Sequence, residues 1–337
     1  MPFVDNILSH RSVSIVGLEK NTGKTETLNY VLNRLKTMDA SIALTSIGVD
    51  GEQTDVVTRT SKPEIVIPKG VIFVTSEVHY LQKRLTAEIL DVSEKRTALG
   101  RLVTARAITE GKAILSGPAE TAEIRKLIAE MERYGVQTTI VDGALSRLSL
   151  ASPAVTDAMI LATGAALSAN IPKLVRKTEF VKQLIELPNV DDELAQKLQP
   201  LTQGIWAIDE NGNVHDLEIP SVFLLDKREK DIFRFGTRLF VSGAVSDKLF
   251  SFLRMQNRNV ELIVNDFSKI FVSQREFNSF LKGGNSIYSL LRSKLIAVTV
   301  NPLSPNGILL DSDTLREEMK KALRVEVYDV KKLAVGD

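Results

Sequence analysis

Short apolar runs alternate with longer amphipathic stretches along most of the chain. The first run covers 13–16, and the segment 25–38 behind it repeats apolar residues at the spacing of one helix face. That face consists of Leu28, Val31, Leu32 and Leu35. A strand followed by a helix in this way is the repeating unit of parallel sheets covered by helices. The pattern therefore predicts an α/β fold.

The same alternation returns later in the chain. Further strands are expected at 41–47, 112–117, 136–141, 158–162, 238–241, 260–264, 295–300 and 325–330. Further helices are expected at 119–133, 170–187, 246–256, 276–282 and 312–323. Two β-rich stretches, at about 59–110 and 204–235, are interpreted as insertions, the first partly antiparallel and the second carrying a hairpin. We thus expect one domain over 1–337, with a mostly parallel sheet and helices on both faces in three layers.

Between the first strand and the first helix the sequence reads Gly17-Leu-Glu-Lys-Asn-Thr-Gly-Lys-Thr. A loop of this kind presents backbone N–H groups and the positive end of the helix dipole, which bind phosphate oxygens. In such a phosphate loop (P-loop, or Walker A motif) Lys24 reaches the terminal phosphates and acts in catalysis, while the Thr25 hydroxyl binds Mg²⁺. The predicted nucleotide contacts are Asn21, Thr22, Gly23, Lys24, Thr25 and Glu26.

The loop departs from the usual spelling in its length. Five residues separate Gly17 from Gly23, so Leu18 occupies a position at which glycine is usual. A degenerate loop that no longer binds nucleotide, or an ordinary glycine-rich turn with a solvated Lys24, is the alternative. The strand before the loop and the helix after it favour nucleotide binding.

Acidic residues follow two of the predicted strands. They are Asp50, Glu52 and Asp55 after the strand at 41–47, and Asp142 after the strand at 136–141. Short helical crossovers make strands parallel, so these acids are expected at the same sheet edge as the loop. Because Mg²⁺ prefers oxygen ligands, Asp50 and Asp142 are expected to complete the metal site with Thr25, and Asp142 to act in catalysis. Solvated loop acids and an Asp-Gly turn are the alternatives.

Small residues end four of the apolar runs. The pairs are Ser116-Gly, Asp142-Gly, Thr163-Gly and Ser242-Gly. Small side chains let a ligand approach the edge of an open sheet, although tight strand-to-helix turns have the same composition.

Composition restricts the function classes. The 337 residues carry a net charge of +1, which provides no overall attraction for nucleic acid or an anionic membrane. There is no cysteine, which excludes thiolate–zinc sites and disulfides, and there are three histidines, far apart in sequence. No secretion signal and no membrane-spanning apolar run is recognisable. We expect a soluble cytoplasmic protein without nucleic-acid or membrane partners; a homodimer is left open.

Three stretches resemble the dethiobiotin synthetase family, within the wider class of MinD-type P-loop ATPases. The loop from Gly17 to Thr25 has that family's five-residue spacing, Val141-Asp-Gly-Ala resembles its acidic strand end, and Asn301-Pro resembles its late strand. The resemblance implies ATP and Mg²⁺ as ligands, a three-layer P-loop fold, and contact between Asn301 and the base. Glu19 stands where the MinD-type loop has a second lysine.

A fainter resemblance, over 44–52, is to ATPases that accompany cobalamin-dependent aminomutases.

Two functions follow as hypotheses. One is a nucleotide-switched ATPase that acts on a partner protein or cofactor enzyme, as a chaperone or reactivase does. The other is an ATP-dependent ligase or kinase for a small carboxylate or amine, with Arg147 or Lys20 facing an anionic substrate.

Overall fold

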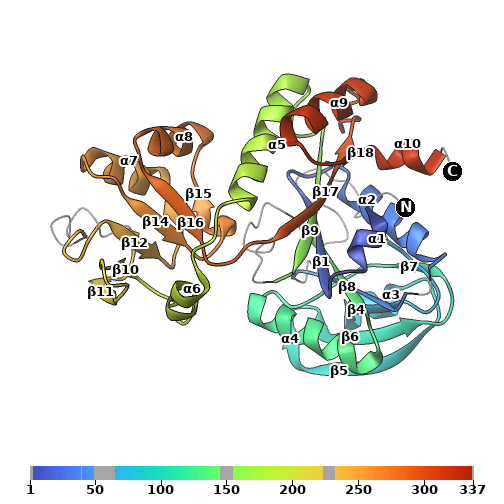
Figure 1. Cartoon of the computed structure of the whole chain (residues 1–337). Helices are drawn as coiled ribbons and strands as arrows, with labels where there is room; N and C mark the ends of the chain where they lie inside the picture. Colours follow the sequence, from blue (N-terminus) through green and yellow to red (C-terminus); the bar gives the residue numbers. More distant parts are fainter. Residues whose placement is uncertain (1–2, 39, 49–64, 145–154, 223–231, 336–337) are drawn as a thin grey trace. The chain divides into compact units, whose positions relative to one another are not determined.

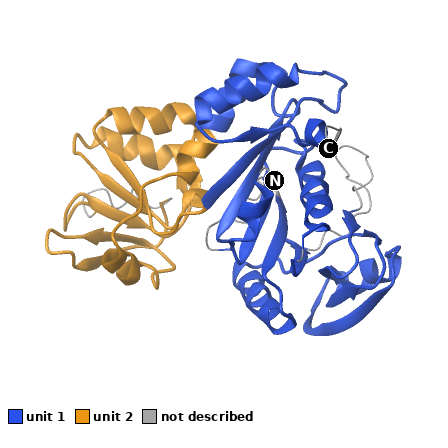
Figure 2. Cartoon of the chain, turned by 45° about the vertical axis from the view of Figure 1, so that its right-hand side comes forward, with its two compact units in different colours: residues 1–179, 294–337 blue, residues 180–293 orange. Residues whose placement is uncertain are grey.

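The computed structural model describes residues 3–38, 40–48, 65–144, 155–222 and 232–335. The chain forms two compact units, where the sequence pattern predicts one domain (Figure 2). The first combines Met1–Glu179 with Lys294–Asp337, and the second is Phe180–Ser293. The first unit is thus made from both ends of the chain.

A nine-stranded sheet forms the centre of the first unit (Figure 1). Its strands are β1 (Ser12–Gly17), β2 (Ile42–Ser46), β4 (Ile72–Ser76), β5 (Ala87–Thr97), β6 (Gly100–Ala107), β8 (Thr138–Ala144), β9 (Ala158–Gly164), β17 (Lys294–Asn301) and β18 (Val327–Tyr328). Their order is β18-β17-β9-β1-β8-β2-β4-β6-β5. β1 lies between β8 and β9 and is parallel to both. A separate pair is formed by β3 (Ile65–Ile67) and β7 (Gly111–Ala113).

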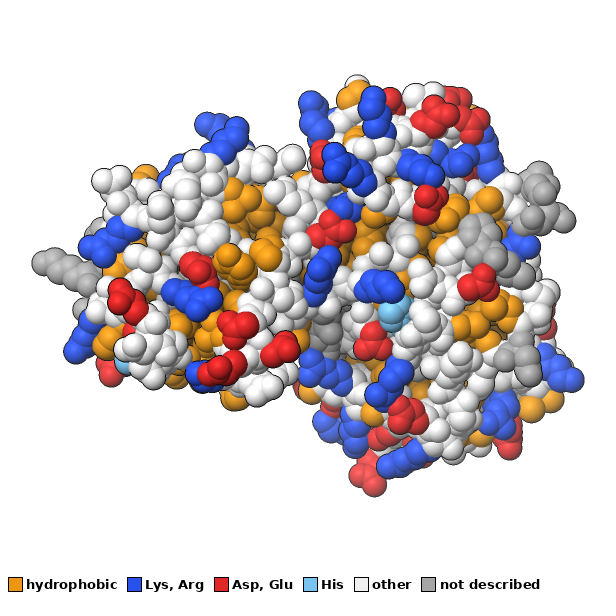
Figure 3. Space-filling model, viewed as in Figure 1, with side chains coloured by type: hydrophobic (Ala, Val, Ile, Leu, Met, Phe, Trp, Pro, Cys, Tyr) orange, Lys and Arg blue, Asp and Glu red, His pale blue; other side chains and the backbone are white. Residues whose placement is uncertain are grey.

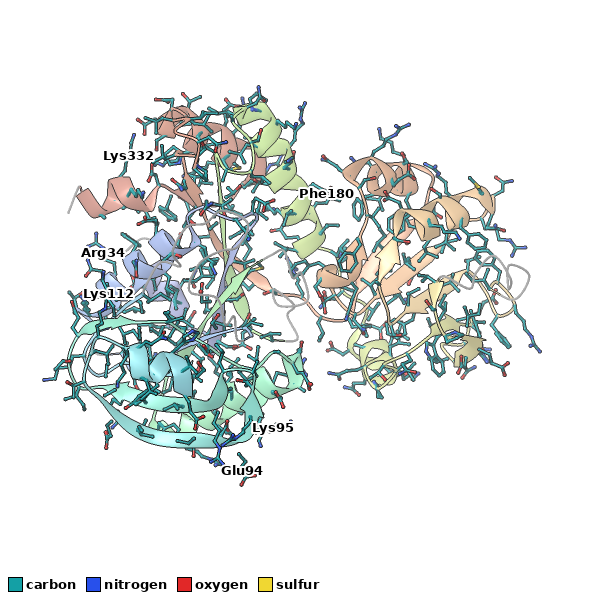
Figure 4. The ribbon with its side chains drawn as sticks, turned by 180° about the vertical axis from the view of Figure 1, so that it is seen from behind. Arg34, Glu94, Lys95, Lys112, Phe180 and Lys332 are labelled. Carbon is teal, nitrogen blue, oxygen red and sulfur yellow. The ribbon has the colours of Figure 1, made fainter. Side chains whose placement is uncertain are left out.

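Helices connect and cover these strands. They are α1 (Val4–Ile7), α2 (Lys24–Leu35), α3 (Glu77–Gln82), α4 (Thr121–Met131) with a 3₁₀ turn (Glu132–Tyr134), α5 (Ile171–Ile185), α9 (Ser312–Leu323) and α10 (Val330–Val335). The predicted apolar face of α2 is confirmed, because its four residues are buried in one cluster with Val13 and Ile15 of β1. Burying each such side chain contributes about 1.5–3 kcal/mol. Arg34 ties α2 to α10 by donating to the Leu333 carbonyl at 3.4 Å (Figure 4).

The predicted fold class is wrong. A mostly parallel three-layer P-loop sheet was expected, but the sheet is mixed, because β6 runs antiparallel to both β4 and β5. Only two residues join β5 to β6, and so short a connection forces antiparallel pairing. Within the described part of the expected insertion at 59–110, β4, β6 and β5 therefore extend the main sheet, whereas β3 pairs with β7.

The second unit has its own mixed sheet, in the order β11-β10-β12-β14-β16. Its strands are β10 (Ile205–Ile208), β11 (Val214–Ile219), β12 (Arg238–Val241), β14 (Glu261–Val264) and β16 (Ser286–Ser289), beside a small pair of β13 (Val245–Ser246) and β15 (Ile270–Phe271). Its helices are α6 (Asp192–Leu198), α7 (Asp247–Met255), a 3₁₀ turn (Phe267–Lys269) and α8 (Gln274–Lys282). The predicted hairpin is confirmed as β10 and β11, which lie in the sheet of this unit.

The face of the molecule that Figure 3 shows carries both signs of charge. Basic and acidic side chains are interspersed on the face seen in Figure 3. In the described part of the chain, every helix is too short or too polar to span a lipid bilayer.

Candidate functional site

The predicted loop lies between a buried strand and a helix, as its sequence requires. β1 is buried along its whole length and ends at Gly17, and α2 begins at Lys24. Gly23 has a φ of 95°, in the left-handed region that favours glycine. A Cβ atom on Gly23 would also lie 2.8 Å from the Cβ of Asn301. Both the backbone turn and the neighbouring side chain therefore require glycine at this position.

The additional residue of the loop has a structural role. Leu18 is almost fully buried, and its N–H donates to the Ala162 carbonyl at 2.9 Å. This bond continues the pairing of β1 with β9 by one residue beyond Gly17. The Leu18 side chain, at the position where glycine is usual, is therefore buried and does not disrupt the loop before α2.

Thr22 stabilises the loop through a hydrogen bond within it. Its side chain is 1% exposed and its hydroxyl donates to the Glu19 carbonyl at 2.8 Å. A Cβ on Gly17 would approach that hydroxyl to 2.8 Å. Thr22 was predicted as a nucleotide contact; its side chain instead holds the loop, which leaves its backbone for a ligand.

Lys24 and Asp142 meet across two neighbouring strands. Asp142 lies near the end of β8, in register with Ile15 of β1, and its Oδ1 is 2.9 Å from the Lys24 Nζ. The side chains are 25% and 16% exposed, so this pair is partly shielded from solvent. Asp142 Oδ1 is buried and has no hydrogen-bond partner within the described residues other than this ion pair. The acid therefore holds the lysine at the mouth of the loop.

Asn301 supports the loop from the end of β17. Its side-chain amide donates to the Asn21 carbonyl at 3.2 Å, and its Oδ1 accepts from the Leu303 N–H at 3.2 Å. Asn21 itself has a φ of 61°, a conformation that asparagine tolerates better than most residues. The residue predicted to touch the base thus contacts the loop Gly17–Thr25 through its amide group.

A hydroxyl pair at the base of the loop was not predicted. The Thr27 hydroxyl donates to the Gly23 carbonyl at 3.0 Å and lies 2.8 Å from the Thr299 hydroxyl. Thr27 thereby fixes α2 to β17. No sequence signal distinguishes Thr27 from other polar residues of the helix.

Two other predicted residues lie apart from this cluster or outside the described chain. Glu26 forms an ion pair with Lys331 of α10 at 3.4 Å, and both side chains are about half exposed. Asp50 lies outside the described residues. So do Glu52, Asp55 and Arg147. Among the small-residue turns, Ser116-Gly, Asp142-Gly and Thr163-Gly belong to the first unit, but Ser242-Gly belongs to the second.

The residues present fit a nucleotide-bound Mg²⁺. Within the described residues, no three His, Cys, Asp or Glu side chains gather closely enough to hold a metal on their own. A Mg²⁺ ion that arrives with a nucleotide needs few protein ligands, because phosphate oxygens and water fill most positions. The Thr25 hydroxyl, in the first turn of α2, and the buried carboxylate oxygen of Asp142 are suitable donors.

Comparison with known proteins assigns the chain to no family. No model of a known protein family matches the chain, and no curated protein is significantly similar to it.

Proposed function

We propose that the chain binds ATP with Mg²⁺ at the loop Gly17–Thr25 and works as a nucleotide-switched ATPase on a partner protein. The observation that carries the proposal is the contact of Lys24 with Asp142 at the mouth of this loop. A lysine that is kept in place by one acid is ready to exchange that partner for phosphate oxygens. Lys24 begins α2 and Asp142 lies on β8, far apart in sequence, so their contact is an independent support.

Each residue has a role in this proposal. The backbone N–H groups from Asn21 to Lys24 and the N-terminus of α2 bind phosphate oxygens. Lys24 neutralises negative charge on the terminal phosphate, and the Thr25 hydroxyl holds the ion, with Asp142 beside it. Mg²⁺, when bound, supplies further neutralisation of the phosphate charge. Asn301 keeps the loop in its shape through the Asn21 carbonyl.

The second unit favours the switch over the small-molecule ligase. Phe180–Ser293 has its own sheet and its own buried cluster, and contributes none of the loop residues. Such a separate body suits the contact with a partner protein. The ligase hypothesis depends on an anion-binding side chain, for which Lys20 and Arg147 remain the candidates. A cytoplasmic location belongs to the proposal, since a chain without cysteine needs no oxidising compartment.

Calorimetric titration with ATP and Mg²⁺ tests nucleotide binding. We expect Lys24→Ala to abolish binding. Lys36→Ala is the matched control, because Lys36 follows the end of the same helix and pairs with Glu110. Unchanged affinity in Lys24→Ala, or an equal loss in both variants, contradicts the proposal. GTP in the same titration decides the choice of base.

ATP hydrolysis separates the two functions. The rate is measured for the protein alone, with small carboxylic acids and amines, and with proteins encoded beside its gene. Stimulation by a protein supports the switch. Strong stimulation by a small acid or amine supports the ligase or kinase instead.

A further inference from the structure

A buried histidine lies outside the loop but is connected to its sheet edge. His79, in α3, is 3% exposed, and its Nδ1 is 2.8 Å from the hydroxyl of Ser116, which is fully buried. Ser76 caps the helix, with its hydroxyl accepting from the His79 N–H at 3.3 Å. Polar groups buried in this way are costly unless they are hydrogen-bonded, so the bond between His79 and Ser116 fixes two distant segments to each other.

Ser116 begins a turn that is packed onto the end of β2. A Cβ on Gly117 would lie 1.9 Å from the Ser46 carbonyl oxygen, so the two backbones are in direct contact. The Gly48 N–H donates to the Pro118 carbonyl at 2.9 Å, and the Gly117 N–H donates to the Gly48 carbonyl at 3.3 Å. Backbone contacts thus hold Gly117 and Pro118 against the end of β2 and against Gly48, which follows it.

The end of β2 in turn contacts the acid of the candidate site. Ser46 is in register with Asp142 of β8, and its hydroxyl donates to the Asp142 carbonyl at 3.2 Å. Asp142 then holds Lys24 through its carboxylate. A continuous series of contacts leads from His79 to the lysine of the phosphate loop.

We propose that His79 is a positioning residue for the nucleotide site, acting through Ser116 and the turn Ser116–Pro118 on Asp142. The inference rests on the proposed nucleotide binding for its functional meaning. Among the described contacts, the series from His79 to Asp142 runs through Ser116 and the end of β2. The proposed series of contacts links α3, which contacts β4 and β6 on one side of β2, to Asp142 on β8, the strand on the other side of β2.

Nucleotide affinity in matched variants of the full chain tests the inference. We expect His79→Ala and Ser116→Ala each to weaken ATP–Mg²⁺ binding about three- to tenfold, the effect of one lost buried hydrogen bond. The double variant should be no weaker than either single one, since both remove the same bond. His79→Asn places an amide near the Nδ1 position and should restore affinity, whereas His79→Gln reaches the Nε2 position and should not.

A second buried hydroxyl pair in the first unit is the control for plain destabilisation. The Thr156 hydroxyl donates to the Ser14 hydroxyl at 3.1 Å, which joins the chain just before β9 to the middle of β1, outside the loop Gly17–Thr25. Thr156→Val should lower the thermal midpoint and leave ATP affinity unchanged. Equal loss of affinity in Thr156→Val, unchanged affinity in Ser116→Ala, or equal behaviour of the Asn and Gln variants at position 79 overturns the inference.

Hydrogen exchange without nucleotide separates this inference from the proposed function. In Ser116→Ala, we expect faster amide exchange across 138–144 than in the wild type, and no change there in Thr156→Val. Unchanged exchange in Ser116→Ala overturns the positioning role. If exchange responds but the wild-type protein binds no ATP, the proposed function is wrong and the coupling of His79 to the sheet edge stands.

Discussion

Removing Lys24 should destabilise the protein even without nucleotide. In Lys24→Ala, the Asp142 carboxylate loses the cation 2.9 Å from its Oδ1. That oxygen is buried and has no hydrogen-bond partner among the described residues. The variant therefore leaves a partly buried charge without compensation.

The size of the effect follows from the exposure of the pair. A solvent-exposed ion pair contributes about 0–1 kcal/mol, whereas breaking a buried one costs about 3–5 kcal/mol. Lys24 and Asp142 are 25% and 16% exposed and lie between these limits. We expect Lys24→Ala to lower the free energy of unfolding by about 1–3 kcal/mol.

Urea unfolding of four proteins measures this effect. They are the wild type, Lys24→Ala, Asp142→Asn and the double variant. An amide at position 142 needs no cation, so the double variant should recover most of the stability lost in Lys24→Ala. Lys95→Ala is the surface control, because Lys95 is 81% exposed in its pair with Glu123, and we expect no measurable change. Equal loss in Lys24→Ala and the double variant would refute the reasoning.

Two further changes have defined outcomes. Gly23→Ala should weaken nucleotide binding at least about tenfold. It should also lower the free energy of unfolding by more than the roughly 1–2 kcal/mol of left-handed strain, because the added Cβ meets Asn301. Gly135→Ala is the control for the strain alone in urea unfolding, because Gly135 has a φ of 73° and open space around it. His215 and neighbouring amides hold the pKa of Asp209 well below its ordinary value. The resulting stabilisation is fully present above the unfolded pKa and is lost progressively as pH falls toward the lower folded pKa. The difference between the calorimetric midpoints of wild type and Asp209→Asn should therefore shrink as pH falls below about 4; a constant difference contradicts this.

Local patterns predicted most elements but not how the sheets are divided. The helix from Lys24 and the hairpin around Asp209 were recognisable because their periodicity and turn residues act within a few positions. The antiparallel edge and the second sheet depend on pairings between distant segments. Strand β16 and helix α6 were missed, since Ser286–Ser289 is too short to show a period and Asp192–Leu198 follows a proline-containing stretch.

The candidate site was predicted as far as one strand, one loop and one helix determine it. Lys24 and Asp142 were expected at the same edge, and the structure places them in contact. The support given by Asn301 and Thr27 was not foreseeable, because it joins the loop to a strand far away in sequence. The hydrogen bond of Leu18 likewise depends on the pairing of β1 with β9, and the sequence does not specify which strands pair.

The dependence of the loop on β17 also sets an order for biosynthesis. A ribosome completes Gly17–Thr25 early, but Asn301 and Thr299 are translated only after the whole of Phe180–Ser293. Until then Gly23 lacks the side chain above it, and α2 lacks its hydroxyl contact to β17. The nascent chain therefore carries the loop without these contacts, and they form only late in translation.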